Sequence, residues 1–135
     1  MGPIPFDLEC HDMTILEDLL QLGFDPITEW TMNGTKIGFS LKGWTDHGGW
    51  LYAFVVDNEV KYIGLTDGVL RTRLDHYRYS RESQNARLRD HIIAELSASR
   101  RVQVFGWRQR DKSILVSTEI ELIAKHRPAW NRMLR

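Results

Sequence analysis

Two tyrosines and an arginine stand in the middle of the chain at spacings that can bring them to one site. Tyr52 and Tyr62 lie on either side of a polar break at residues 57–59, and Arg73 follows eleven residues after Tyr62. The residues on both sides of the break follow a period of two, which predicts a β-hairpin. The two phenols are therefore expected close together across the hairpin. With a guanidinium nearby, such a group can bind a phosphate and hold a proton beside it.

A carboxylate and an amide stand near the other end of the chain. Glu119 falls in a predicted helix over residues 114–125, and Asn131 follows it by twelve residues, beyond Pro128. Hydrolysis of a phosphodiester needs an activated water and relief of charge on the phosphate and the leaving oxygen. Mg²⁺ can provide that relief while held by one carboxylate and several waters. One carboxylate such as Glu119 could hold the ion, but the sequence pattern alone favours an acid that stabilises the first turns of its helix.

Hydrophobic periodicity predicts the elements that must position these side chains. The predicted strands and helices after residue 49 are strands 50–56, 60–64 and 101–107, and helices 69–78, 86–98 and 114–125. In chain order they read β-β-α-α-β-α. This order predicts an α+β fold, a three-stranded antiparallel sheet flanked by helices.

The first 49 residues are expected to form an acidic extension that packs on a core domain of residues 50–135. Thr14, followed three residues later by a glutamate, makes a capping-box pattern that opens a predicted helix over residues 15–22. A short strand is predicted over residues 36–41. The expected role of this extension is structural support, or contact with a second copy of the chain or a partner protein.

Charge is unevenly distributed along a chain whose formal net charge is zero. Residues 1–49 hold eight acids against two lysines, whereas residues 50–135 hold sixteen basic side chains, most of them arginine, against ten acids. A basic half of this kind favours nucleic-acid contact, and arginine suits bidentate binding of phosphates. Five arginines are predicted to contact nucleic-acid phosphates: Arg71, Arg78, Arg81, Arg87 and Arg89. The alternative is a solvated surface whose oppositely charged halves attract each other.

Other classes of protein are disfavoured by composition. The 135 residues contain one cysteine, Cys10, which cannot form an internal disulfide, as is typical of a reducing compartment. No apolar run approaches the roughly 20 residues of a membrane span. The chain also lacks the apolar leader of a secreted protein. These features predict a cytoplasmic protein with no membrane partner.

Two separated motifs resemble the GIY-YIG nuclease domain family. The first lies in the predicted hairpin and the helix after it, and the second is similar to the closing segment of the family, in which Pro and Asn follow a Glu. The matching residues are Leu51, Tyr52, Tyr62, Ile63, Gly64, Arg73, Glu119, Pro128 and Asn131. The chain departs from the family at Trp50, where members usually have Gly, and at Leu65, where many have Lys.

The resemblance implies roles for the residues that carry the chemistry. Glu119 corresponds to the metal ligand of the family, and Arg73 to the arginine that binds the scissile phosphate. Tyr52 corresponds to the tyrosine beside the attacking water, which is often assigned as the general base. Tyr62 corresponds to a second phenol that shares its hydrogen-bond network.

The remaining matches imply positioning roles. Tyr77 lies four residues after the arginine, where the family carries His or Tyr, and the adjacent His76 is the alternative for that position. Asn131 is expected to orient Tyr52, a phosphate oxygen or the Glu119 carboxylate.

The resemblance and the charge distribution together predict a metal-dependent DNA endonuclease that hydrolyses phosphodiester bonds with one Mg²⁺ or Mn²⁺. Two alternatives remain open. One is a catalytically silent module that binds nucleic acid, which would show salt-dependent binding without cleavage. The other is an interaction protein whose acidic extension docks a partner.

Overall fold

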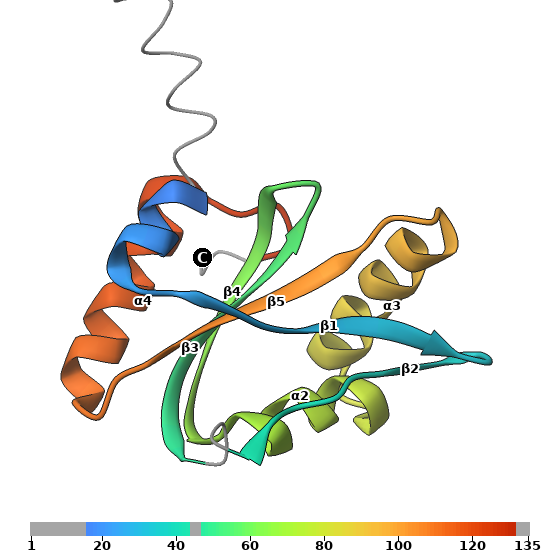
Figure 1. The fold of residues 1–135 in the computed structure, drawn as a ribbon, viewed down its shortest axis with the longest axis horizontal. Helices are drawn as coiled ribbons and strands as arrows, with labels where there is room; N and C mark the ends of the chain where they lie inside the picture. Colours follow the sequence, from blue (N-terminus) through green and yellow to red (C-terminus); the bar gives the residue numbers. More distant parts are fainter. Residues whose placement is uncertain (1–15, 44–46, 132–135) are drawn as a thin grey trace, which may run out of the picture.

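A computed structural model describes residues 16–43 and 47–131 of the chain (Figure 1). The predicted hairpin is confirmed as β3 (Gly48–Val56) and β4 (Glu59–Val69). Asp57 and Asn58 form its turn, and both have positive φ angles, of 52° and 65°, which suits a two-residue hairpin turn. The predicted helices are confirmed as α2 (Leu70–Tyr79), α3 (Ser83–Ser97) and α4 (Lys112–His126).

The sheet has five strands, so the prediction of a three-stranded sheet is wrong. β1 (Asp25–Asn33) and β2 (Lys36–Gly38) join β5 (Val102–Arg108) and the hairpin in the order β2-β1-β5-β3-β4. All neighbouring strands are antiparallel. Figure 1 shows the strands as one twisted sheet, in which β1 crosses in front of β5. The fold is therefore α+β with a larger sheet than the sequence predicts.

β1 is not predicted from the sequence, because its hydrophobic and polar residues do not alternate with a period of two. Among its nine residues only Trp30 is buried, and Pro26 and Glu29 are uncommon strand residues. The strand forms because β2 and β5 supply hydrogen-bonding partners on both of its edges. Tertiary pairing thus overrides a weak local preference.

The sheet is covered on both faces by helices. In the described part of the chain, α2 and α3 pack on one face over a core that includes Trp30, Tyr52 and Phe54. The helix of residues 16–22 and α4 pack on the other face, over Leu51 and its neighbours in β3. Every residue of β3 from Gly49 onward is buried, because β3 lies between two strands and two helical layers.

The N-terminal segment contributes to this same sheet. The predicted helix is present over residues 16–22, while Thr14, its predicted cap, and Cys10 lie outside the described residues. Gly23 ends the helix with a φ of 112°, a conformation that favours glycine. The strand predicted over residues 36–41 is present as the shorter β2, which ends at Gly38. The division of the chain at residue 49 stays a prediction, although β1 and β5 are directly paired.

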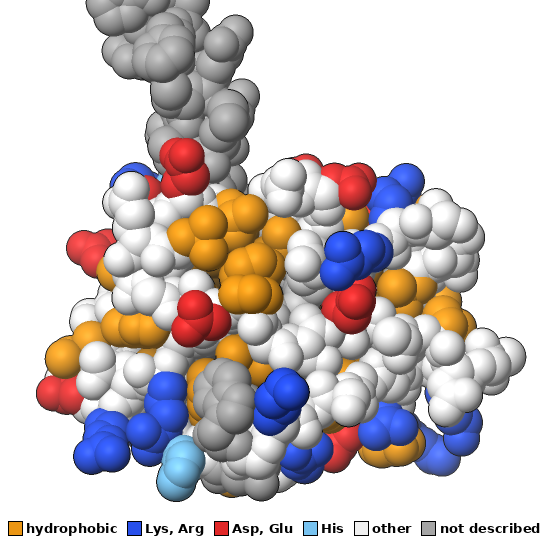
Figure 2. All heavy atoms as spheres, viewed as in Figure 1, with side chains coloured by type: hydrophobic (Ala, Val, Ile, Leu, Met, Phe, Trp, Pro, Cys, Tyr) orange, Lys and Arg blue, Asp and Glu red, His pale blue; other side chains and the backbone are white. Residues whose placement is uncertain are grey.

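Opposite charges of the two halves of the chain do meet. Asp18 forms an ion pair with Lys125 at 3.1 Å, and its Oδ2 lies 2.7 Å from Nε2 of His126. Glu29 pairs with Arg101 at 3.0 Å. Figure 2 shows acidic and basic side chains interspersed on one face, with Lys and Arg gathered along its lower margin. Of the helices described, none is long and apolar enough to cross a membrane.

Candidate active site

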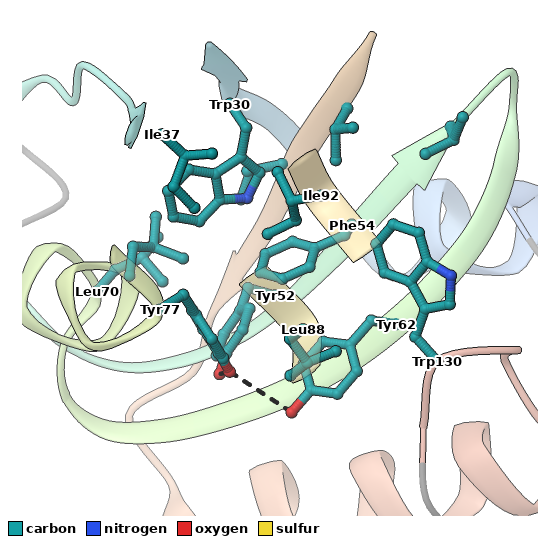
Figure 3. Packing of buried hydrophobic residues seen from close by; sticks show 14 of the residues in the cluster. Trp30, Ile37, Tyr52, Phe54, Tyr62, Leu70, Tyr77, Leu88, Ile92 and Trp130 are labelled. Atoms are coloured by element: carbon teal, nitrogen blue, oxygen red, sulfur yellow. Dashed lines mark hydrogen bonds between the residues drawn. The ribbon is translucent and has the colours of Figure 1, made fainter. Parts of the chain in front are cut away.

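Three phenols converge on the face of the sheet covered by α2 and α3. The hydroxyl of Tyr52 lies 2.6 Å from that of Tyr77, and Tyr77 donates a longer hydrogen bond of 3.5 Å to Tyr62. Figure 3 shows the three side chains pointing their hydroxyls toward one another from β3, β4 and α2. Tyr52 and Tyr77 are fully buried, and Tyr62 is 7% exposed. We call these three residues the tyrosine cluster.

The two phenols of the hairpin are offset by two residues instead of facing each other. Tyr52 pairs with Gly64, and Phe54 pairs with Tyr62. A Cβ atom added to Gly64 would lie 2.5 Å from Cζ and 2.6 Å from the hydroxyl of Tyr52, so the tyrosine ring lies directly over the glycine backbone. The sequence identifies Gly64 only as part of a motif, whereas the structure shows why a residue without a side chain is needed there. Gly64 lets the Tyr52 side chain cross β4.

Arg73 lies beside the tyrosine cluster. It donates a hydrogen bond from Nε to the hydroxyl of Tyr52 at 3.0 Å, and its guanidinium carbon lies 5.2 Å from the ring centre of Tyr77. Among the residues that the structure describes, its two terminal nitrogens form no hydrogen bond or ion pair. Arg73 is half-buried. Its guanidinium is thus oriented by one nitrogen and keeps the other two available for an anion.

Burial governs proton affinity in the cluster. It raises the pKa of Tyr52 well above the ordinary value of 10, although Arg73 and the hydrogen bond with Tyr77 act in the opposite direction. Burial also raises the pKa of Tyr77. Both phenols therefore keep their protons at neutral pH. A neutral phenol can donate and accept hydrogen bonds, but it is a poor base.

Glu119 lies on α4, which packs on the other face of the sheet. It lies on the face of α4 that also carries the buried Leu115 and Leu122, because residues three and four apart share a helix face. Burial raises the pKa of Glu119, while the positive charge of Arg73 lowers it in part. Within the described ranges, the carboxylate has no hydrogen bond or ion pair. It is a half-buried anion near a cation.

Asn131 clamps the chain that follows α4 onto the edge of the sheet. Its Oδ1 accepts a hydrogen bond from the backbone N–H of Ile63, and its Nδ2 donates one to the carbonyl of Ile63, both at 2.9 Å. Next to it, the backbone N–H of Trp130 donates to the carbonyl of Lys61 at 2.7 Å. The amide of Asn131 is thus occupied by the strand that carries Tyr62 and Gly64. Its amide forms no hydrogen bond with Tyr52 or Glu119.

The two candidates that follow Arg73 differ in location. Tyr77 belongs to the tyrosine cluster, whereas the side chain of His76 is exposed. Adjacent helix residues point about 100° apart, so only one of them can face the sheet. The structure brings Tyr52, Tyr62 and Tyr77 together with Arg73 and leaves His76 outside.

Four of the five arginines expected to contact nucleic acid bind main-chain carbonyls. Arg71 donates to Leu41, Arg78 to Ile37, Arg87 to Trp130, and Arg89 to both Tyr77 and Ser80, at 2.8 to 3.2 Å. These guanidiniums tie α2 and α3 to segments on either side of them. The fifth, Arg81, is exposed. Sequence reasoning missed the structural use of these arginines, because their carbonyl partners come from distant parts of the chain.

The site suits a cation held through one carboxylate. No cluster of three or more His, Cys, Asp or Glu is found among the described residues, so a metal caged by protein ligands alone does not fit them. Mg²⁺ needs fewer protein ligands, because it keeps several waters and often binds substrate phosphates. Glu119, whose carboxylate lacks a partner in this part of the chain and whose pKa is raised by burial, fits such an ion.

Comparison with solved structures gives a clear match to the fold. A point mutant of bacteriophage T4 EndoII superimposes with a TM-score of 0.71, covering 87% of this chain and 98% of the other, at 18% sequence identity. The chain therefore shares the fold of this protein.

Sequence comparison gives no match, either to a family model or to a curated protein. Restriction endonuclease HPY188I in complex with product DNA gives a TM-score of 0.48 at 15% identity, covering 82% of this chain and 80% of the other. This similarity is too weak to support a conclusion about the fold.

Proposed function

We propose that the chain is a metal-dependent DNA endonuclease of the GIY-YIG type, which hydrolyses phosphodiester bonds. The observation that carries the proposal is the orientation of Arg73, whose Nε binds Tyr52 and whose terminal nitrogens have no hydrogen bond or ion pair among the described residues. The positive charge of Arg73 also lowers in part the pKa of Glu119, which burial raises. A phosphate is opposite in charge to Arg73, and a hydrated divalent cation is opposite in charge to Glu119. The similarity to the fold of EndoII supports the same reading.

Arg73 would bind the scissile phosphate through its terminal nitrogens. Its Nε is held by Tyr52, and its guanidinium lies over the ring of Tyr77, so the fork is fixed before the substrate arrives. Such preorganisation lowers the cost of binding a charged transition state. Tyr52 and Tyr77 are therefore proposed as positioning residues for Arg73. Tyr62, the least buried of the three phenols, is the better candidate to meet the attacking water.

Glu119 would hold Mg²⁺ or Mn²⁺, and the ion would supply charge neutralisation for the phosphate and the leaving oxygen. Because burial already raises the pKa of this carboxyl group, a cation beside it removes an electrostatic cost. Asn131 is proposed to act indirectly, as a positioning residue. It fixes the backbone of Ile63, and so the strand position of the adjacent Tyr62.

The test is cleavage of supercoiled plasmid and of single-stranded circular DNA in the presence of Mg²⁺, Mn²⁺ or EDTA. The proposal predicts nicked and linear products with either metal and none with EDTA. Binding of both DNAs without any metal-dependent product would overturn it in favour of a silent binding module. Neither binding nor cleavage would favour an interaction protein.

A further inference from the structure

Two elements run side by side away from the candidate active site. On α4, Lys112 precedes Glu119 by seven residues, or two helical turns, and therefore lies on nearly the same face about 10.5 Å along the axis. On β4, Asp67 follows Gly64 by three residues, which is about 10 Å of strand. Lys112 Nζ and Asp67 Oδ2 lie 2.8 Å apart. Counted along α4 from Glu119 and along β4 from Gly64, the distance from the site to Lys112 is about 10 Å in both cases.

We infer that Lys112 binds a DNA backbone phosphate on one side of the cleavage site. This inference rests on the proposed function. One strand of DNA carries a phosphate for about every 3.4 Å of helix axis, so a separation of about 10 Å corresponds to about three nucleotides. A cation at this distance contacts the substrate beyond the scissile phosphate bound by Arg73.

The present partner of Lys112 does not prevent such binding. The side chains of Lys112 and Asp67 are 68% and 56% exposed, and ion pairs between solvated side chains contribute little. A phosphate can therefore replace the Asp67 carboxylate at low cost. Asp67 in turn weakens non-productive anion binding, because its charge is near the same ammonium group.

Other basic side chains lie near the start of α4, together with Asp67 and Asp111. Figure 2 shows Lys and Arg side chains gathered at lower left, over the N-terminal end of α4 as placed in Figure 1. Arg110, which precedes α4, is exposed. The first N–H groups of α4 are not available to a phosphate, because Oδ1 of Asp111 accepts hydrogen bonds from Ser113 and Ile114 at 2.9 and 3.4 Å. The anion would therefore meet side chains, Lys112 foremost.

Lys125 provides a matched control on the same helix. It is 58% exposed and pairs with Asp18 at 3.1 Å, so its solvation and its ion pair resemble those of Lys112. Thirteen residues separate the two lysines, which places them about 220° apart around the helix. Lys125 faces the helix of residues 16–22 instead of β4. Its partner Asp18 is less exposed than Asp67, at 25%, and also lies 2.7 Å from Nε2 of His126.

The experiment measures the affinity of the native protein and of Lys112→Ala, Lys112→Arg and Lys125→Ala for a labelled mixed-sequence duplex in EDTA, between 50 and 200 mM salt. Lys112→Ala is expected to weaken binding about 3- to 10-fold and to reduce the slope of log affinity against log salt by about 1. Lys112→Arg should retain native binding, and Lys125→Ala should match the native protein. Asp67→Asn should bind more tightly than the native protein.

Three results would overturn the inference, and only the last would also overturn the proposed function. If the native protein binds and cuts DNA while Lys112→Ala keeps the native affinity and salt slope, Lys112 has no phosphate contact, and the proposed function stands. The same holds if Lys125→Ala weakens binding as much as Lys112→Ala, because the effect is then one of net charge. If the native protein neither binds nor cuts DNA, the proposed function and this inference fall together.

Discussion

The hydroxyl of the fully buried Tyr52 accepts a hydrogen bond at 3.0 Å from Nε of the half-buried Arg73. This contact joins the inner strand β3 to the first turn of α2. It fixes the direction of a guanidinium whose other nitrogens have no partner among the described residues. The tyrosine cluster is therefore best understood as a support for Arg73.

Tyr52→Phe removes the acceptor for Arg73 without changing the volume of the side chain greatly. Cleavage is expected to fall about 10- to 100-fold, because a small displacement of a positioning group is costly in rate. Stability should fall by about 1–2 kcal/mol, since the variant leaves buried polar partners unmatched.

The pH profile of Tyr52→Phe separates a positioning role from general base catalysis. Burial raises the pKa of Tyr52, so no phenolate forms at neutral pH. The slope of log rate against pH between about pH 7 and 9 should then be the same in the variant and the native protein. A rise in native activity over this range that disappears in Tyr52→Phe would assign the water proton to Tyr52 instead.

Gly64→Ala places a methyl group against the ring of Tyr52. The added carbon would lie 2.5 Å from Cζ, so the ring must shift and Arg73 loses its aligned acceptor. A loss of about 1–3 kcal/mol in stability is expected from such overpacking, together with a loss of cleavage. Gly68→Ala is the control in the same strand, because its Cβ meets nothing closer than 3.8 Å. Urea denaturation should separate the two, and equal stabilities would contradict the close approach.

Asn131→Ala leaves the N–H and C=O of Ile63 without their side-chain partners. Each unmatched buried polar group costs about 1–3 kcal/mol, although water can reach this edge and reduce the loss. The expected outcome is a stability loss of about 1–3 kcal/mol in urea denaturation. Gln21→Ala, at an exposed position, should be neutral. Native stability with lost cleavage would instead indicate that Asn131 contacts the substrate.

Glu119→Gln is expected to stabilise the protein near pH 7. The pKa of Glu119 is raised on folding, so the folded state holds the proton to a higher pH, and stability falls as pH rises through that range. The gain is expected to be at most about 1 kcal/mol, because the site is partly solvated. It should vanish at about pH 3.5, where both states carry a protonated carboxyl group.

The metal dependence of this stability gives a second measurement on the same variant. Mg²⁺ should raise the unfolding temperature of the native protein and leave that of Glu119→Gln unchanged, since a ligand stabilises the state that binds it. An equal shift in both proteins would contradict metal binding at Glu119.

How far the sequence predicts this molecule depends on the kind of contact involved. The three later helices and β3 have clear periodicity and turn signals that predict them close to their observed ends, whereas β4 continues to Val69, beyond its predicted end at Gly64. β1 has one buried side chain and forms through pairing on both edges, so its sequence alone does not predict it. The sheet was therefore assigned too few strands.

The candidate site shows the same limit. The residue types were recognisable, but Asn131 binds a backbone 68 residues away, and the arginines of α2 and α3 bind carbonyls that only the fold brings near. No local pattern specifies such partners. The choice between Tyr77 and His76 is different, because helix geometry allows only one of them to join the cluster.

The most direct test of the site is the rate at which supercoiled plasmid is nicked with Mg²⁺ by the native protein, Glu119→Gln and Glu121→Gln. Glu121 is exposed on the same helix and faces about 200° away, so its variant controls for the loss of one negative charge. The native protein and Glu121→Gln are predicted to nick at similar rates, and Glu119→Gln at a rate at least about 10²-fold lower. Native activity in Glu119→Gln would contradict the account, because the metal and the phosphate would then have to be bound elsewhere.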